Sequence, residues 1–216
     1  HTAADVKDFI NPELSACLDL ADLITCPSSF VADGIRELYP QHMHKVRICP
    51  YGTSVDFGGE FNRPQPGRFF WAGNCPFRKG LHLFAEAAAN VKSNYPQAEF
   101  RVAGITDPEI IRDPRYSALT FLGKLDAAAM KREFLHADAF VLPSLADGMA
   151  SVCVEALSAG CPLIVPPSAG IDPEDGIFPG ILLPELTASA LTEAMTVMLT
   201  DRSLRNDLAQ NAGRQS

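Results

Sequence analysis

Short apolar runs alternate along the chain with longer stretches of helical periodicity. The runs are four to six residues long and are mostly closed by glycine or proline, which is typical of strands buried on both faces of a parallel sheet. These predicted strands lie at 23–26, 46–49, 68–73, 100–104, 119–123, 139–143, 162–166 and 181–184. The helical patterns lie at 29–38, 81–94, 126–136, 151–159, 187–200 and 201–211.

This alternation predicts an α/β fold with a doubly wound, Rossmann-like parallel sheet, built from βαβ units with right-handed crossovers. Residues 51–67 interrupt it with glycines, prolines and no periodicity, which predicts a linker. We therefore expect residues 1–50 to be the tail of one α/β domain, holding two short strands and two helices. Residues 68–216 are expected to form a second, complete domain.

Composition narrows the classes of partner. The formal net charge is -8, whereas duplex-DNA binders carry basic patches that displace counterions, so we expect no nucleic-acid partner. The chain holds no run of about 18 apolar residues, so we expect no transmembrane segment. It opens on His1 without a signal-like segment, which favours a fragment or a processed chain.

The cysteines and histidines lack the spacing of metal ligands. The six cysteines are far apart and include no CxxC pair, so we expect small buried side chains in a reducing compartment. His42 and His44 could share a metal on an extended segment, but two ligands alone make a poor site. We expect no metal site.

Ligands of open parallel sheets bind outside the carboxyl ends of the strands, which points to the loops at 73–80, 104–107, 123–126 and 143–151. In the last of these, Asp147 precedes a helix that starts near Ser151 and carries Glu155. The first helical turn offers N–H groups to a phosphate. The carboxylates would be about 12 Å apart on a continuous helix, which suits an extended ligand better than one scissile bond. The plain alternative is that Asp147 and Glu155 only stabilise the helix start.

The loop at 73–80 carries two neighbouring cations, Arg78 and Lys79, directly before Gly80. Lysine as a point charge and arginine as a fork could together hold a diphosphate at this strand-to-helix corner. The plain alternative is a solvated turn with ordinary surface cations. No Walker A loop and no GxGxxG fingerprint occurs in the sequence.

Together these segments resemble the carboxy-terminal, donor-binding half of a GT-B-fold retaining glycosyltransferase of the glycosyl transferases group 1 family. The resemblance runs from about Ala21 to the end, through ADLITCPSS, ICPYGTSVD and AGNCPFRKG. Its most specific part is Asp147-x7-Glu155, followed by Ala156 and by AGCP at 159–162, which is similar to the family's E-G-F-G-x-x-x-x-E-A-x-A-x-G-x-P.

The resemblance implies an enzyme that transfers a sugar from a UDP-, GDP- or ADP-linked donor with retention, without a metal or other cofactor. It implies that Asp147 contacts the donor sugar, Lys79 neutralises the diphosphate and Glu155 binds the ribose hydroxyls. Backbone amides of 149–152 would complete the phosphate cradle, and 123–125 would lie beside the base. The donor-binding residues that it implies are Gly73, Asn74, Arg78, Lys79, Gly123, Lys124, Leu125, Gly148, Met149, Ala150, Ser151, Val152 and Glu155.

The sequence departs from the family pattern at several of these positions. Asp147 replaces the usual glutamate, Met149 and Ala150 replace phenylalanine and glycine, and Asn74 stands where an arginine is expected. Arg78 could supply the missing cation. These departures favour an alternative, a non-catalytic relative kept for assembly or ligand sensing. A second alternative, a nucleotide-sugar epimerase of the same fold, is disfavoured by the order of the motifs.

The resemblance also implies what the chain lacks. The family's acceptor domain precedes the linker, and only its last piece corresponds to residues 1–50. We therefore expect this chain to bind a donor without transferring the sugar by itself. The acceptor, the base and the sugar stay open, and the intact protein is expected in the cytoplasm, either free or at the membrane surface.

Overall fold

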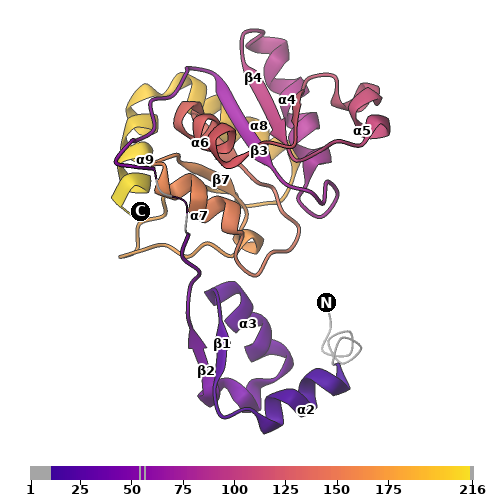
Figure 1. Ribbon diagram of the computed structural model, residues 1–216, viewed down its shortest axis with the longest axis vertical. Coiled ribbons are helices and arrows are strands. Elements are labelled where there is room, and N and C mark those ends of the chain that lie inside the picture. The colour runs from indigo at the N-terminus through magenta and orange to yellow at the C-terminus, as the bar shows by residue number, and fades with distance from the viewer. Residues whose placement is uncertain (1–10, 54, 56, 215–216) are drawn as a thin grey trace.

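The structure, a computed structural model, describes residues 11–53, 55 and 57–214, whose strands form two separate parallel sheets (Figure 1). The larger sheet has six strands in the order β5-β4-β3-β6-β7-β8. Their bounds are β3 (Arg68–Ala72), β4 (Glu99–Ala103), β5 (Thr120–Gly123), β6 (Ala139–Val141), β7 (Leu163–Val165) and β8 (Gly180–Leu182). All neighbouring pairs are parallel. This strand order is that of a doubly wound fold, so the predicted fold class is confirmed.

The core of this sheet explains the apolar runs. Phe69, Phe70 and Trp71 on the central strand β3 are fully buried, although their side chains alternate between the two faces. Phe69 stacks on Phe100 of β4 with ring centroids 5.6 Å apart, and Phe70 meets Phe140 of β6 edge-on at 5.7 Å. Helices cover both faces, and a strand covered on both faces needs apolar residues at consecutive positions.

The helices follow from the order of the strands. Helix α4 (Leu81–Asn94) joins β3 to β4 and packs beside α8 (Ala188–Thr200). Helix α6 (Ala127–His136) joins β5 to β6 in the opposite direction across the sheet, and right-handed crossovers therefore place it on the other face. Helix α7 (Ser151–Ser158) follows β6, and α9 (Arg202–Arg214) packs against both α7 and α8.

The amino-terminal part forms a small unit of its own around the parallel strands β1 (Ile24–Cys26) and β2 (Val46–Ile48). It also holds α2 (Pro12–Leu20), α3 (Ser29–Leu38) and the 3-10 turn Pro40–Lys45. Residues 1–10 of the predicted tail lie outside the described residues.

Hydrogen bonds from Ser28 and Ser29 join the start of α3 to the larger unit. The Ser28 hydroxyl donates to the Gly148 carbonyl oxygen, and the Ser29 N–H donates to Asp172 Oδ2 at 2.7 Å. The amino-terminal unit therefore contacts the loop that precedes α7 directly.

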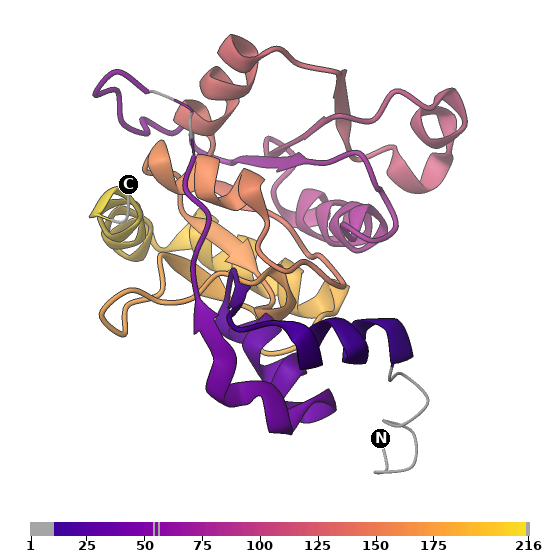
Figure 2. The same cartoon turned by 60° about the horizontal axis from the view of Figure 1, so that its bottom comes forward.

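The predicted linker has no helix or strand among its described residues, and it runs from β2 past α7 toward α6 (Figure 2). It is anchored rather than loose. The Asn62 side chain donates to the carbonyls of Phe134 and Ala137 at 2.7 and 2.8 Å, and Phe57 is buried in the core of the larger unit. The domain boundaries at 50 and 67 stay a prediction.

The predicted element bounds need small corrections. Most predicted strands ran too far at their carboxyl ends. Where the closing residue is a proline, as at Pro143 and Pro166, it lies beyond the ladder and has no N–H to donate to it. Helix α5 (Pro108–Arg112) and the 3-10 turns Pro114–Tyr116 and Pro167–Ala169 were not predicted. These turns start at proline and are too short to show helical periodicity.

Candidate functional site

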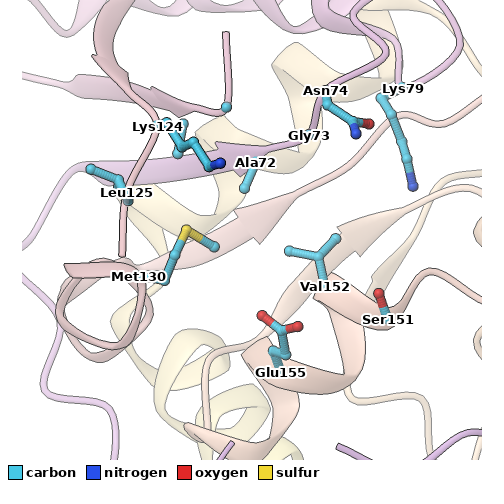
Figure 3. Close-up of a pocket in the computed structure, with 12 residues that line it drawn as sticks. Ala72, Gly73, Asn74, Lys79, Lys124, Leu125, Met130, Ser151, Val152 and Glu155 are labelled. Atoms are coloured by element: carbon cyan, nitrogen blue, oxygen red, sulfur yellow. The ribbon is translucent and has the colours of Figure 1, made fainter. Parts of the chain in front are cut away.

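A pocket of about 340 Å³ lies at the carboxyl ends of the central strands, facing the first turns of α7 (Figure 3). It sits beside the switch between β3 and β6, the crevice in which doubly wound sheets bind ligands. Loops after β3, β4 and β5 and the helices α6 and α7 contribute its walls. The lining residues are Ala72, Gly73, Asn74, Lys79, Ala103, Gly104, Lys124, Leu125, Met130, Ser151, Val152 and Glu155.

A side chain of the preceding strand β3 holds the loop from Gly73 to Gly80 in place. The buried indole of Trp71 donates through Nε1 to the Lys79 carbonyl at 3.1 Å. Gly80 then takes a left-handed backbone (φ 69°), and a Cβ there would collide with the Pro143 carbonyl oxygen. The chain therefore needs glycine at this corner, which places Lys79 at the pocket wall.

A second close approach of backbones shapes the pocket floor. Gly104 has φ 93°, and its Cα lies so near the Gly73 carbonyl that no Cβ could be accommodated. The Gly73 N–H in turn donates to the Ala103 carbonyl at 3.1 Å. The two loops are thus held together at the point where the strands β3 and β4 end.

Asp147 is the centre of a charged network beside the pocket. Its Oδ1 accepts from Arg78 Nη1 at 2.7 Å, and its Oδ2 accepts from Lys79 Nζ at 2.8 Å and from the Ser144 hydroxyl at 2.6 Å. The side chains of Asp147 and Lys79 are each only 11% exposed, whereas Arg78 is 47% exposed. The network therefore ties the loop before α4 to the loop before α7.

This network controls the charge of Asp147. Burial acts to raise its pKa, but hydrogen bonds from Lys79, Ser144 and Arg78 outweigh burial and hold the pKa below its ordinary value. A carboxyl group with a lowered folded-state pKa contributes stability above its unfolded pKa, and this contribution is lost as the pH falls through the folded pKa. Asp147 is therefore ionised at neutral pH.

Helix α7 begins without a side-chain cap. Ala150 occupies the N-cap position and makes no side-chain hydrogen bond. Within the described chain, the backbone N–H groups of Ser151 and Val152 have no protein acceptor, whereas that of Cys153 donates to the Ala150 carbonyl at 2.8 Å. Both residues line the pocket. Free N–H groups and the positive end of the helix dipole make this turn suited to an anion.

Glu155 lies one turn further along α7 and directs its carboxylate toward the pocket (Figure 3). The side chain is half-buried beside Val152, and none of the described residues donates a hydrogen bond to it. Burial raises the pKa of Glu155. A half-buried carboxylate without a protein partner can accept hydrogen bonds from the hydroxyl groups of a ligand.

The opposite wall is more apolar. Leu125 and Met130 contribute aliphatic and thioether surface, and Lys124 lies at the rim with an exposed side chain. Gly123 ends β5, with φ 67°. Met130 was not predicted from the sequence. Its position one turn after Asp126, which caps α6 by accepting from the Ala129 N–H at 2.7 Å, is the signal that could have found it.

The structure brings most of the predicted site residues together. Gly73, Asn74, Lys79, Lys124, Leu125, Ser151, Val152 and Glu155 all line the pocket. The remaining predicted residues, Arg78, Gly123, Asp147, Gly148, Met149 and Ala150, are not among its lining residues.

Several of the residues outside the pocket wall have other contacts. Arg78 points to Asp147 and also donates to the Ala146 carbonyl at 2.7 Å, so the hypothesis that it replaces the missing cation has no direct support. Met149 accepts through Sδ from the Tyr51 N–H at 3.2 Å and lines a second cavity, on the side of the amino-terminal unit. The role of each predicted residue toward a ligand stays a prediction.

The cysteines divide into a buried and an exposed group. Cys26, Cys153 and Cys161 are buried as expected, but Cys17, Cys49 and Cys75 are exposed, so the expectation was wrong for these three. No group of three His, Cys, Asp or Glu side chains that could hold a metal ion occurs in the described part of the chain. In the same part, no helix combines the length and apolarity needed to cross a bilayer.

Comparison with known proteins identifies the class. Residues 66–201 match the family glycosyl transferases group 1. The match spans more than half of the chain, so the chain belongs to this family. Glycogen synthase from Mycobacterium tuberculosis is 27% identical over 158 residues, which make up 69% of this chain but only 38% of that protein. The chain thus spans well under half the length of this relative.

Solved structures of glycosyltransferases share the fold. Sucrose-phosphate synthase from Thermosynechococcus elongatus matches with a TM-score of 0.75 and 21% identity, over 100% of this chain and 61% of that one. The pneumococcal O-GlcNAc transferase GtfA, solved in complex with UDP and GlcNAc, matches with a TM-score of 0.69 and 16% identity, over 93% of this chain and 43% of that one.

Proposed function

We propose that this chain is the donor-binding half of a retaining glycosyltransferase and that its pocket binds a nucleotide-diphosphate sugar. One observation carries the proposal. At the switch point of the sheet, a single pocket places the Lys79 ammonium and the uncapped first turn of α7 near an unpaired carboxylate, Glu155. Cationic and N–H groups suit a diphosphate, and the carboxylate suits sugar hydroxyls.

The pocket divides into parts that match the parts of such a donor. Lys79 and the N–H groups of Ser151 and Val152 would bind the diphosphate, and Glu155 would accept hydrogen bonds from the ribose hydroxyls. The apolar wall of Leu125 and Met130 would face the base. Membership of the glycosyl transferases group 1 family and the UDP held by the pneumococcal neighbour support this assignment.

The same groups would act on the leaving group. When the bond between sugar and phosphate breaks, negative charge develops on the departing diphosphate. Fixed donors that already point to that position stabilise the charge without reorganising, which is an electrostatic contribution to transition-state binding. The first turn of α7 would supply such fixed donors, and Lys79 would add its charge once its ammonium turns from Asp147 toward the phosphate, without a metal. Sugar transfer would also need the acceptor-binding part of the protein, so we expect none from this chain alone.

Isothermal titration calorimetry with UDP, GDP and ADP tests the donor site. We expect one of the three nucleotides to bind preferentially, and Glu155→Ala to weaken that binding about tenfold to hundredfold, as expected for lost hydrogen bonds to a charged group. Glu86→Ala is the matched control, since Glu86 is exposed on α4 and is not a pocket residue. Equal affinity in wild type and Glu155→Ala would contradict the role of Glu155. Absence of binding by all three nucleotides to the folded chain would contradict the donor site.

A non-catalytic nucleotide-sugar-binding relative is the second candidate, and the Asp147 network favours it. Both cations of the loop before α4 are already paired with a carboxylate, which leaves less positive charge for a departing diphosphate. Hydrolysis of a nucleotide sugar by the intact protein, lost in Lys79→Met, would support the enzyme. Tight binding of the same nucleotide sugar without hydrolysis or transfer would support the non-catalytic relative.

A further inference from the structure

We propose that Asp147 is an internal counter-anion of the donor site, which competes with the diphosphate for Lys79 and so limits how tightly nucleotide is held. The inference rests on the proposed function, because it concerns the same pocket. It differs from the role that the family resemblance implied, in which this residue contacts the donor sugar.

The contacts of Asp147 show that its carboxylate is engaged before any ligand binds. Three side chains donate to its two oxygens, and its backbone N–H donates to the Ser168 carbonyl at 2.8 Å. The Ser168 hydroxyl in turn donates to the Ser144 carbonyl at 2.7 Å. The carboxylate is therefore held in place from several directions, with its charge directed at the two cations.

Lys79 is the residue of this network that can contact either Asp147 or a diphosphate in the pocket. Its side chain lines the pocket while its ammonium donates to Asp147 Oδ2. An ammonium has three N–H donors, and Asp147 is its one hydrogen-bond partner among the described residues. Arg78 and Ser144 would keep Asp147 in place when Lys79 turns toward a phosphate oxygen. The pair is 11% exposed on both sides, so solvent screens it less than an ordinary surface ion pair.

The consequence is a donor site with a reduced net positive charge. The negative charge of Asp147 repels a diphosphate that approaches Lys79. Because Asp147 is ionised at neutral pH, this repulsion is always present when a diphosphate enters the pocket. After sugar transfer, the same carboxylate would regain Lys79 and favour release of the nucleoside diphosphate. Release of product limits turnover in many enzymes, which gives such a counter-anion a function.

The test is the isosteric change Asp147→Asn, which removes the charge and keeps the shape. We expect it to raise the affinity for inorganic pyrophosphate, and for the preferred nucleotide among UDP, GDP and ADP, by about tenfold at low salt. The gain should shrink at about 0.5 M NaCl because salt screens the charges. The corresponding nucleoside, which has no phosphate, should bind wild type and variant equally.

Asp126→Asn is the matched control. Asp126 is an exposed carboxylate next to the pocket residues Lys124 and Leu125, and it caps α6 without pairing with a cation. Asparagine also caps helices, so this variant changes the net charge to the same extent without loosening α6. We expect less than a twofold change in pyrophosphate affinity, which would separate pairing with Lys79 from a general change in charge.

The possible outcomes distinguish this inference from the proposed function. Unchanged or weaker pyrophosphate binding by a folded Asp147→Asn, together with loss of nucleotide binding in Glu155→Ala, would overturn the counter-anion and leave the donor site intact. Absence of binding by both wild type and folded Asp147→Asn would overturn both.

If the variant does not fold, a crystal structure of the wild-type chain with the bound nucleotide decides the question. We expect Lys79 Nζ to contact a phosphate oxygen while Arg78 stays on Asp147. Phosphates bound away from Lys79 would overturn the inference.

Discussion

At the scale of one residue, Glu155 is positioned to bind a ligand at the expense of the stability of the fold. Its carboxylate is half-buried, faces the pocket and receives no hydrogen bond from the described residues. Burial raises its pKa, because the ionised form loses water without gaining a partner. The stability contribution of such a group is full below its unfolded pKa and is lost as the pH rises through its folded pKa. The ionised form of Glu155 is therefore the form that costs the folded chain free energy.

The variant Glu155→Gln should accordingly be slightly more stable than wild type at pH 7. We expect a rise of roughly 1–2 °C in the midpoint of thermal unfolding, since the neutral amide avoids the cost of burying a charge. At a pH below the unfolded pKa of glutamate, about 4.3, the difference should vanish because wild-type Glu155 is then protonated. Circular dichroism melts at both pH values measure the effect, with the exposed Glu86→Gln as control. A loss of stability at pH 7 would show that Glu155 has a stabilising partner.

The sequence indicated which residues are candidates for the site, but it did not indicate all of their hydrogen-bond and ion-pair partners. Lys79, Ser151 and Glu155, which the rule that ligands bind beyond the carboxyl ends of parallel strands had selected, line one pocket, and their roles toward a ligand stay a prediction. The pairing of Asp147 with both Arg78 and Lys79 was not predicted. It depends on how two loops, about 70 positions apart in the chain, approach each other, and such an approach leaves no local sequence pattern.

At the scale of elements, the loops after β3 and β4 are positioned by glycines that permit close backbone contact. Gly104 combines a positive φ of 93° with a Cα packed against the Gly73 carbonyl. Gly123, after β5, also has a positive φ, of 67°, but nothing lies near the position of its missing Cβ. A side chain at position 123 would therefore cost only the strain of a left-handed backbone, whereas a side chain at position 104 would add a steric collision.

We expect Gly104→Ala to lower the free energy of unfolding by about 3 kcal/mol and Gly123→Ala by only about 1 kcal/mol. A left-handed alanine costs roughly 1–2 kcal/mol by itself, and the collision at position 104 adds backbone displacement. Urea unfolding followed by fluorescence of Trp71, the single tryptophan, measures both values. Gly104→Ala should also weaken nucleotide binding, because it displaces the pocket loop that starts at Gly73. Equal destabilisation in both variants would show that the loops can move apart without cost.

At the scale of the whole molecule, α9 is joined to the sheet domain through a buried ion pair. Asp138, fully buried just before β6, accepts from the Gly67 N–H, and its Oδ1 lies 3.2 Å from Arg205 Nη1. Burial raises the pKa of Asp138 although Gly67 and Arg205 act to lower it. Because Gly67 ends the linker segment, this one carboxylate connects the linker, the central sheet and the last helix.

Removal of the cation should therefore destabilise the whole larger unit. We expect Arg205→Met to cost about 3 kcal/mol at pH 8, since it leaves a buried carboxylate without its counter-charge. The raised folded pKa of Asp138 sets the sign of the pH dependence, because its stability contribution is lost as the pH rises through that pKa. The loss of unfolding free energy in the variant should therefore be smaller at acid pH, where Asp138 is protonated. Urea titrations at both pH values test this. Arg202→Met, on the exposed side of the same helix, serves as control. A deficit independent of pH would point to lost packing of the arginine stem instead.

The sequence by itself determined the fold class, and it pointed to the loops that line the candidate pocket. Apolar runs bounded by glycine and proline define parallel strands through local chemistry, and the order of strands and helices then restricts the topology to a doubly wound sheet. The tertiary structure alone decided which cations are already neutralised, how the linker is anchored at Asn62 and which α6 residue faces the pocket. These properties depend on distances between segments that are remote in the chain, and such distances are fixed only when the two faces of the sheet are packed.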